Sequence, residues 1–366
     1  MYTARAAARR GLFRRGECAS WSSAFFLAGS PDGLEPSEVY RQLFEYVELA
    51  DRLGFDSIWF AEHHFSNYGY IPNPLLMIAR VAAMTSPRVR LGTAVLVLPF
   101  WHPLRVAEDI ALTDHLVDGR LEVAVARGYQ PYEFARFGLT FDDARERTDE
   151  ALAILLGALT QTDLTYEGRF HSIPPTTILP APLQRPHPPI WLAAHTRESF
   201  EIGARLGLDA FTTNSGRPLS VLEETWAAFN AAQAAHGEGR RARFGVQSQI
   251  CVAPTDEAAA AEMAHFLYAS RQSTNLRRGT QSVQGGRSRP LPYEGEPGLD
   301  ELFHDRTLSG SPATVRRKLE AYTRVCQMSQ LNCTFQLGAM TPAHIKRSIQ
   351  LFAEEVMPAF RVTAAV

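Results

Sequence analysis

The sequence has 366 residues, of which 45% are hydrophobic and 21% charged, and its formal net charge is −2. A chain of this length can bury a large core, either as one barrel domain or as two smaller domains. The near-neutral charge argues against nucleic acid or an anionic membrane surface as the main partner, and no apolar stretch approaches the ~20 residues of a membrane-spanning helix.

The cysteines and the first residues bear on location. Cys18, Cys251, Cys326 and Cys333 show no CxxC motif and no metal-ligand spacing, so we expect reduced thiols in a cytoplasmic protein. Residues 1–22 carry five arginines and one acid without an apolar signal region. We interpret them as a disordered basic extension or a mis-assigned start, in preference to a targeting signal.

The first half of the chain alternates between strand-like and helix-like segments. Apolar runs of strand length are followed by segments with helical periodicity, which often have proline near their start and glycine past their end. The expected strands are 24–27, 56–61, 91–98 and 121–126, and the expected helices are 37–53, 73–84 and 103–118.

Residues 91–129 form the unit around which we expect the rest of the chain to be arranged. The apolar runs 91–98 and 121–126 are typical of parallel strands buried on both faces. The second run leads directly into Arg127 and Gly128. The carboxyl ends of parallel strands are where such folds bind ligands.

The second half continues the alternation, with two interruptions. Residues 160–188 are proline-rich and are predicted to be an excursion outside the barrel, and residues 270–300 are polar with weak periodicity, which indicates a long mobile loop. We expect helices at 141–159, 196–206, 219–235, 255–268, 312–325 and 342–356, and strands at 190–194, 209–212, 244–252 and 332–337. Eight strand–helix units predict an α/β fold, a (β/α)8 TIM barrel, forming one domain over residues 23–366.

Three motifs give the sequence a family resemblance. They are GFDSIWFAEHHF at 54–65, GTAVLVLPFWHPLRVAEDIALTDHLVDGR at 92–120 and ARGYQPYEFARFG at 126–138. With these spacings the sequence resembles the bacterial luciferase-like flavin monooxygenases, and the luciferase α subunit in particular. The similarity extends from about Phe25 to Phe360.

The resemblance implies a reaction and its partners. Members of this family bind reduced FMN (FMNH2) at the carboxyl ends of the barrel strands. There it reacts with O2 to give a C4a-peroxyflavin that oxygenates an organic substrate, such as an aldehyde or a secondary metabolite. A separate flavin reductase usually supplies the FMNH2. No G-x-G-x-x-G follows any predicted strand, so a dinucleotide site of Rossmann type is not expected.

Arg127 and the start of the helix after 190–194 are the expected phosphate site. A guanidinium at a strand end can make charge-assisted bonds to phosphate, and helix N-termini favour anions. The resemblance assigns cofactor contacts to Ala194, His195, Thr196 and Ser199, although the family has an acid where this chain has His195. The alternative for Arg127 is an ion pair with Glu133 or Asp143.

His63 falls on the family's catalytic histidine, which is thought to act as a base. Histidine suits that task because it titrates near neutral pH. Glu62 is a second catalytic candidate by position, although alternation along a strand would point Glu62 and His64 away from His63. The alternative is a structural histidine, and we expect no metal site.

Further positions follow from the resemblance alone. Ala94 and Val95 match a non-prolyl cis peptide that lies under the flavin ring. Ala126 stands where luciferase has a reactive cysteine, and Tyr129 completes the ARG-Y motif beside the flavin. Asn214 replaces an aromatic residue of the luciferase pocket, so the substrate should differ from a long-chain aldehyde.

Several alternatives and two expectations about architecture remain. The same barrel could use deazaflavin F420 for hydride transfer, or the chain could be a non-catalytic flavin-binding partner subunit. We expect a homodimer through the helices after the second and third strands, and a lid over the flavin formed by residues 270–300.

Overall fold

The computed structural model describes residues 21–31 and 33–361, so the prediction for residues 1–22 lies almost wholly outside it. Eight parallel strands close into a barrel, because β9 pairs with both β8 and β13 and β13 pairs with β1. The predicted (β/α)8 fold is therefore confirmed. The barrel strands are β1 (Ser22–Phe26), β2 (Ser57–Phe60), β3 (Arg90–Val97), β4 (Leu121–Ala126), β7 (Ile190–Ala193), β8 (Asp209–Thr213), β9 (Phe244–Val252) and β13 (Gln330–Thr334).

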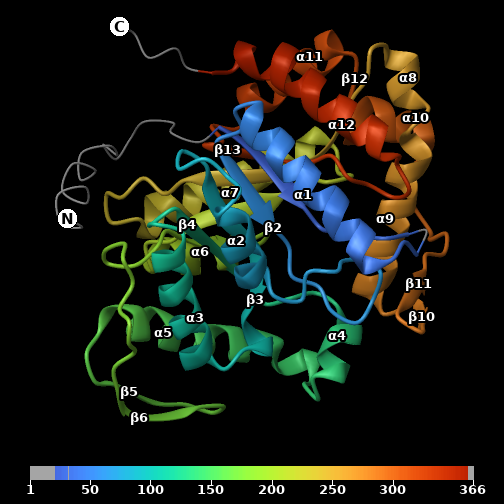
Figure 1. Ribbon diagram of the computed structural model, residues 1–366. Helices are drawn as coiled ribbons and strands as arrows, with labels where there is room; N and C mark the ends of the chain where they lie inside the picture. The colour runs from blue at the N-terminus through green and yellow to red at the C-terminus, as the bar shows by residue number, and fades with distance from the viewer. Residues whose placement is uncertain (1–20, 32, 362–366) are drawn as a thin grey trace, which may run out of the picture.

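Helices surround the strands, as Figure 1 shows. Several begin with proline at the first helical position, where the missing N–H costs nothing, and their apolar faces pack on the outside of the barrel. These helices are α1 (Pro36–Arg52), α2 (Pro74–Ala82), α3 (Pro103–Leu116), α5 (Ala144–Thr160), α6 (Arg197–Arg205), α7 (Leu219–His236), α11 (Pro312–Val325) and α12 (Pro342–Leu351). Among the described residues, none of the helices is long and apolar enough to cross a bilayer.

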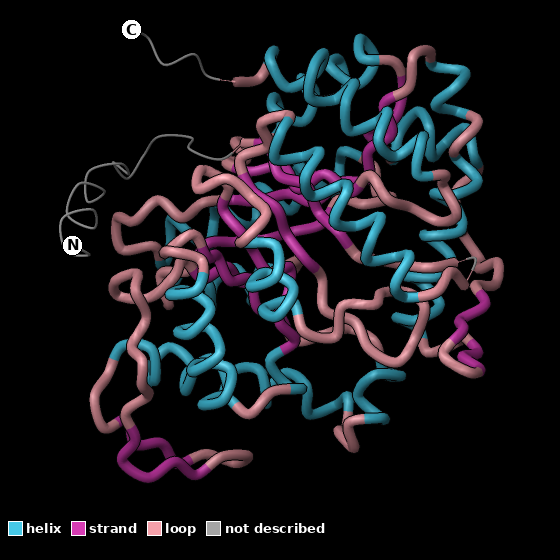
Figure 2. The backbone as a smooth tube through the Cα atoms, in the orientation of Figure 1, coloured by secondary structure: helices cyan, strands magenta, loops and turns pink. Residues whose placement is uncertain are grey.

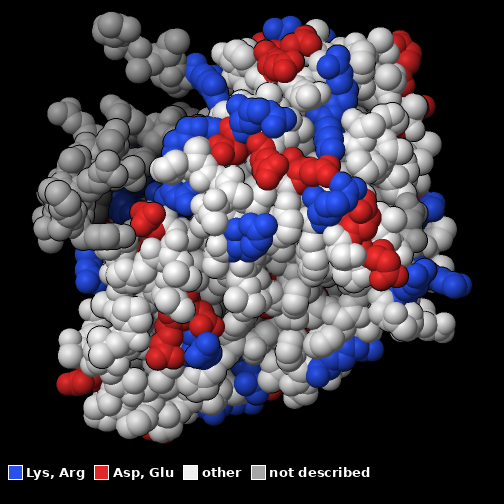
Figure 3. Space-filling model, in the orientation of Figure 1, with Lys and Arg blue, Asp and Glu red and all other residues white. Residues whose placement is uncertain are grey.

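The excursion predicted for residues 160–188 is a two-stranded antiparallel hairpin, β5 (Leu164–Glu167) and β6 (Ser172–Thr176). It projects from the body of the molecule in Figure 2. On the face shown in Figure 3, acidic and basic side chains are interspersed, and neither sign dominates.

The long insertion between β9 and β13 differs from the expectation. The predicted helix 255–268 is two helices, α8 (Asp256–Ala260) and α9 (Met263–Arg278), so the first part of the segment 270–300 is helical. It continues into a hairpin, β10 (Ser282–Gln284) and β11 (Arg287–Arg289), whose turn residues Gly285 and Gly286 have φ of 55° and 74°. Positive φ at both turn positions suits glycine and a tight hairpin. Before α11 come α10 (Leu299–Glu301), a π-helical turn (Leu302–Arg306) and β12 (Leu308–Gly310), which extends the sheet beside β9.

Some expected elements shift by a few residues. The last strand is Gln330–Thr334 rather than 332–337, and the start of the predicted helix 141–159 is a 3-10 turn (Phe141–Asp143). A six-residue helix, α4 (Pro131–Arg136), was not predicted. The short remaining turns are Leu98–Phe100, Phe352–Val356 and Met357–Ala359.

Inside the barrel, one layer of side chains is aromatic and the next layer consists of small residues. Trp59 and Trp191 meet edge to face, with ring centroids 5.8 Å apart, and both are fully buried. Gly92 lies against the Trp59 indole, where an added Cβ would stand 2.4 Å from a ring atom. Glycine at position 92 therefore allows the indole to fill the barrel.

Candidate active site

The mouth at the carboxyl ends of the strands brings the predicted site residues to one face of the barrel. His63 follows β2, Arg127 and Tyr129 follow β4, and Ala194–Ser199 connects β7 to α6. Because all eight strands are parallel, these segments meet at the same end. His63 and Ser199, 136 positions apart in the sequence, thus belong to one site.

His63 lies in a buried polar environment that the sequence did not reveal. Its Nδ1 is 3.2 Å from Glu133 Oε1 and 2.9 Å from Gln130 Nε2. Glu133 also accepts a hydrogen bond from the His64 backbone N–H at 2.8 Å, and it is only 1% exposed. With a proton on Nδ1, the imidazole donates to the Glu133 carboxylate and leaves Nε2 free to accept a proton; with Nδ1 unprotonated, Nδ1 instead accepts from the Gln130 amide N–H.

Aromatic rings enclose the His63 imidazole. The Tyr68 ring centroid is 4.6 Å away and the Tyr129 centroid 5.8 Å away, both edge-on. The Tyr129 hydroxyl donates to the Tyr68 hydroxyl at 3.1 Å, and burial raises the pKa of both phenols. The two tyrosines are therefore neutral hydrogen-bonding groups beside His63.

Glu62 and His64 face away from His63, as expected from the alternation. Glu62 Oε1 is 2.9 Å from His64 Nε2, and its Oε2 accepts the Val97 N–H at 2.9 Å and lies 3.1 Å from Trp101 Nε1. Burial raises the pKa of Glu62, against the effect of His64. The carboxyl group thus ties the loop after β2 to the end of β3, and the structure puts Glu133 rather than Glu62 beside His63.

Arg127 and the start of α6 offer unpaired groups for an anion. The Arg127 side chain is exposed, has the Phe141 ring 5.9 Å away, and makes no hydrogen bond or ion pair with a described residue. It therefore does not pair with Glu133 or Asp143. Thr196 caps α6 by accepting from the Ser199 N–H at 3.3 Å, and the two hydroxyls are 2.9 Å apart. Such hydroxyls and free N–H groups at a helix N-terminus suit a phosphate.

His195 stands at the edge of this cluster. Its Nδ1 is 3.0 Å from Thr212 Oγ1. Surrounding protein lowers the pKa of His195 to about 4, with Arg217 and Arg277 contributing in the same direction, although the side chain remains exposed at the mouth. The imidazole is therefore neutral near pH 7 and can hydrogen-bond an anion without adding charge.

Two arginines at the mouth were not predicted individually. Arg277, near the end of α9, lies over the Tyr129 ring with 5.0 Å between the guanidinium carbon and the centroid. Arg217 follows β8, and burial together with Arg277 lowers its pKa. Neither guanidinium has a carboxylate partner within the described part of the chain. The only sequence signal was the high arginine content of residues 270–300.

Small residues form the floor of the mouth. Ala61 and Ala94 lie above the barrel tryptophans, with Val95 and Ala193 packed against the same inner cluster. The peptide bond between Ala94 and Val95 is cis, as the resemblance implied, and Ala126 ends β4 next to Arg127. Side chains of this size suit a planar ring system bound above them.

Asn214 is buried and faces the wall of the barrel. Its Nδ2 donates to the Tyr322 hydroxyl at 2.9 Å and lies 3.3 Å from the Arg217 carbonyl oxygen. The position of an aromatic residue in the luciferase pocket is thus occupied here by a group that fixes the loop carrying Arg217.

Comparison with known proteins gives a consistent result. A profile of the family described as "Luciferase-like monooxygenase" matches residues 22–326. The oxygenase component of the flavin-dependent trigonelline monooxygenase of Acinetobacter baylyi is 32% identical over 88% of this chain and 90% of its own. An alkanal monooxygenase alpha chain from the Kryptophanaron alfredi symbiont is 28% identical over 50% of this chain and 51% of its own. Among solved structures, monooxygenase RslO1 from Streptomyces bottropensis superposes with a TM-score of 0.79, at 27% identity, over 93% of this chain and 100% of its own.

Proposed function

The chain belongs to the luciferase-like monooxygenase family, and from this premise we propose that it is the oxygenase component of a two-component enzyme that uses FMNH2 and O2 to oxygenate an organic substrate. The proposal rests on one observation: the same mouth holds His63 beside the buried Glu133 carboxylate, an Arg127 side chain with no hydrogen-bonding or ion-pair partner among the described residues, and two hydroxyls at the start of α6.

The side chains divide into three roles. Arg127, Thr196 and Ser199 would hold the phosphate, and the small residues Ala94 and Ala126 would lie against the ring. Bound FMNH2 would supply the oxygen chemistry, by forming a C4a-peroxyflavin with O2. His63 would accept a proton at Nε2 while Glu133 holds its Nδ1–H, and Tyr68 and Tyr129 would keep water from the imidazole.

A rapid-mixing experiment tests this proposal. Protein loaded anaerobically with FMNH2 is mixed with O2, and the flavin spectrum is followed. We expect a transient oxygenated flavin that outlives the one formed in free solution. Reoxidation at the same rate with and without the protein would contradict the proposal, and tight binding of reduced F420 without such a transient would favour the F420 alternative.

The partners follow from the same reasoning. The chain contains no G-x-G-x-x-G for a nicotinamide dinucleotide, so we propose that a separate flavin reductase supplies FMNH2. Cys251, Cys326 and Cys333 are buried and unpaired, which supports the proposed cytoplasmic location. Trigonelline, on which the Acinetobacter relative acts, is the first organic substrate to assay.

We also propose a homodimer formed by α2 and α3, which pack side by side. Three leucines on these helices are unusually exposed: Leu76 at 70%, Leu112 at 48% and Leu116 at 58%. Apolar side chains exposed together in this way mark an interaction surface. Light scattering should report a dimer at micromolar concentration and a monomer for the double variant Leu76→Glu/Leu112→Glu, and a monomeric wild type would refute the proposal.

A further inference from the structure

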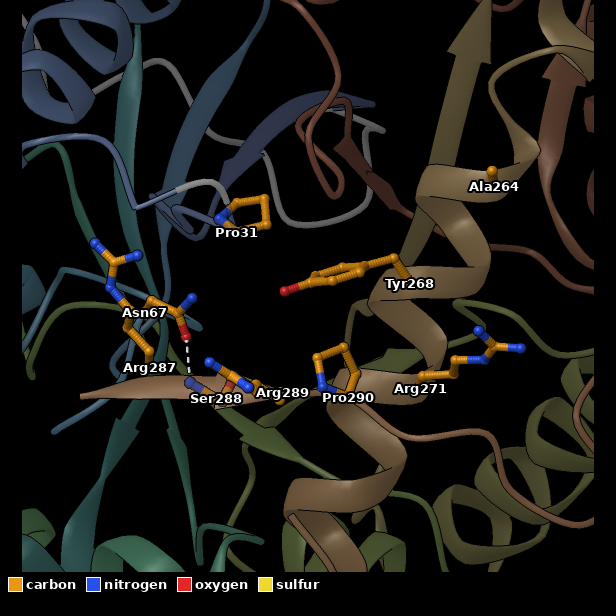
Figure 4. Close-up of a pocket in the computed structure, with 9 residues that line it drawn as sticks. All are labelled: Pro31, Asn67, Ala264, Tyr268, Arg271, Arg287, Ser288, Arg289 and Pro290. Carbon is orange, nitrogen blue, oxygen red and sulfur yellow. Dashed lines mark hydrogen bonds between the residues drawn. The ribbon is translucent and has the colours of Figure 1, made fainter. Parts of the chain in front are cut away.

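A second hollow lies beside the mouth, apart from the Arg127 cluster. This cavity of about 370 Å³ opens between the loops after β1 and β2 on one side and α9 with the β10–β11 hairpin on the other. Figure 4 shows the Tyr268 ring reaching across the space toward Asn67, with Pro31 above it and Pro290 below. The lining residues are Pro31, Asn67, Ala264, Tyr268, Arg271, Arg287, Ser288, Arg289 and Pro290.

The walls of the cavity are held together by buried hydrogen bonds. Asn67 is 3% exposed; its Nδ2 donates to the Ser30 carbonyl at 3.1 Å and its Oδ1 accepts the Ser288 N–H at 2.9 Å. The Ser288 hydroxyl lies 2.6 Å from Gln272 Nε2 on α9. The hairpin is thus docked on the loop after β2, so the cavity does not depend on a bound ligand for its shape.

The charge on the lining is positive and only partly compensated. Arg271 is neutralised by Glu296, with Nε 2.7 Å from Oε2, and it points away from the space in Figure 4. The guanidinium of Arg287 lies against Gly33, and neither Arg287 nor Arg289 forms a side-chain hydrogen bond or ion pair with any residue that the structure describes. No carboxylate is among the lining residues that the structure describes.

The loop after β2 forms part of the cavity wall and also packs against His63. Asn67, in its wall, is followed by Tyr68, whose ring contacts the His63 imidazole at 4.6 Å between centroids. Gly69 follows, and its backbone lies so close to His63 that an added Cβ would be 3.2 Å from the histidine Cβ. A molecule in the cavity would therefore lie on the His63 side of the mouth, on the far side of Tyr68.

We propose that this cavity binds the organic substrate, and that the substrate is a planar molecule carrying a carboxylate. The Tyr268 ring and the two prolines offer flat apolar surfaces, and the guanidiniums of Arg287 and Arg289 offer the planar, charge-assisted donors that a carboxylate binds. The volume lies in the range of small-molecule sites. The inference rests on the proposed oxygenase function and adds the class of substrate to it.

The test compares two ligands of the same shape, benzoate and benzamide, on the flavin-free protein by titration calorimetry. We expect benzoate to bind at least about tenfold more tightly than benzamide, and Arg289→Gln and the double variant Arg287→Gln/Arg289→Gln to remove that preference. Arg278→Gln is the matched control, because Arg278 lies on the same insertion, faces the Tyr293 ring at 5.3 Å and does not line the cavity. Equal binding of the two ligands, or an Arg278→Gln effect as large as that of Arg289→Gln, would overturn the inference.

A second measurement separates this inference from the proposed function. FMNH2 oxidation is followed in wild type and Arg289→Gln without any organic ligand. A transient oxygenated flavin in both proteins, with no preference for benzoate over benzamide, would reject the cavity and keep the oxygenase. Absence of the transient from wild type would reject the oxygenase, and the substrate role with it, even if benzoate bound the cavity.

Discussion

At the amino-terminal end of the barrel, Arg90 and Arg243 both contact the buried carboxylate of Glu122, whereas at the carboxyl-terminal end Arg127, Arg217 and Arg277 have no carboxylate partner within the described chain. The same residue type is therefore used in two ways. Paired arginines close the bottom of the barrel, and unpaired ones stand around its mouth.

The two ends differ accordingly in their electrostatics. Burial alone would raise the pKa of Glu122, but Arg90 and Arg243 more than reverse this and bring it to about 2. At the mouth, desolvation by the surrounding protein and then Arg217 and Arg277 lower the pKa of His195 to about 4. The arginines at the amino-terminal end are thus neutralised by a carboxylate and stabilise the fold. The arginines at the mouth keep their positive charge, where an anionic ligand is expected.

The largest effect on stability should come from removing the Glu122 carboxylate at the amino-terminal end of the barrel. Glu122→Gln leaves Arg90 and Arg243 without their shared carboxylate, and removing one partner of a buried ion pair costs about 3–5 kcal/mol. Trp191, whose Nε1 donates to Glu122 at 2.7 Å, reports the change by fluorescence during urea unfolding. Glu45→Gln, which removes a partly exposed partner of Arg41 and Lys346, should unfold near the wild-type midpoint. Equal midpoints for the two variants would show that the Glu122 cluster does not stabilise the barrel.

Low pH should also lower the free energy of unfolding through Glu122. Because the pKa of Glu122 in the folded protein, about 2, lies below its ordinary value of 4.5, unfolding takes up a proton over this range. Stability from this group is thus fully present above about pH 4.5 and is lost as the pH falls toward 2, by about 3 kcal/mol in all. Urea unfolding at a series of pH values should show a smaller loss for Glu122→Gln, and identical pH dependence of the two proteins would count against the assignment.

The features of the two barrel ends could not be predicted equally well from the sequence. Strands at 121–126 and 244–252 were predicted to the residue because each is a mainly apolar segment of strand length. Arg127 and His63 could be placed because they follow such runs in recognisable motifs. The pairing of Glu122 with Arg243 joins residues 121 positions apart, and no local pattern encodes it.

The helix that carries Glu133 and the second half of α9 in the insertion were also not predicted from the sequence. Glu133 lies in a helix of six residues, too short for a periodic apolar pattern, although Pro131 at its first position was an available signal. The second half of α9 reads SRQSTNLRR and has few apolar residues, so it was taken for loop. Its order comes from contacts with the β10–β11 hairpin and with Tyr129, which only the folded chain provides.

At the unpaired end, Arg127→Ala should affect ligand binding and leave stability alone. Loss of a charge-assisted phosphate contact should weaken FMN binding by about 1.5–3 kcal/mol. Riboflavin, which lacks the phosphate, should bind wild type and variant equally in a fluorescence titration. Urea unfolding should match wild type, because Arg127 has no described partner to leave unpaired, and a parallel loss of riboflavin binding would indicate misfolding instead.

Glu133→Gln tests the buried carboxylate at the mouth, which supports a histidine rather than an arginine. We expect kcat to fall roughly tenfold, a barrier change of about 1.4 kcal/mol, because the amide no longer holds the Nδ1 proton as a carboxylate does. KM should change little, because Glu133 bonds to His63 and to the His64 N–H rather than to a ligand. A loss of unfolding free energy in urea as large as the change in the kcat barrier would instead indicate a packing role for Glu133.

The smallest expected effect concerns the arginines of the insertion, which bring positive charge to the mouth from outside the barrel. We predict that residues 270–300 open and close over bound flavin, since Arg277 rests on the Tyr129 ring and the Gly286 carbonyl accepts the Asn67 N–H at 2.8 Å. Trypsin should cut the free protein at Arg277, Arg278 or Arg287, more readily than at Arg271, which is paired with Glu296 in mid-helix. Bound FMN should slow the cutting by a small factor, because proteolysis follows the population of the open form. The Arg127→Ala variant is the control: at the same FMN concentration it should lose this protection, and a rate of cutting that ignores FMN in wild type would show that the insertion is not a lid.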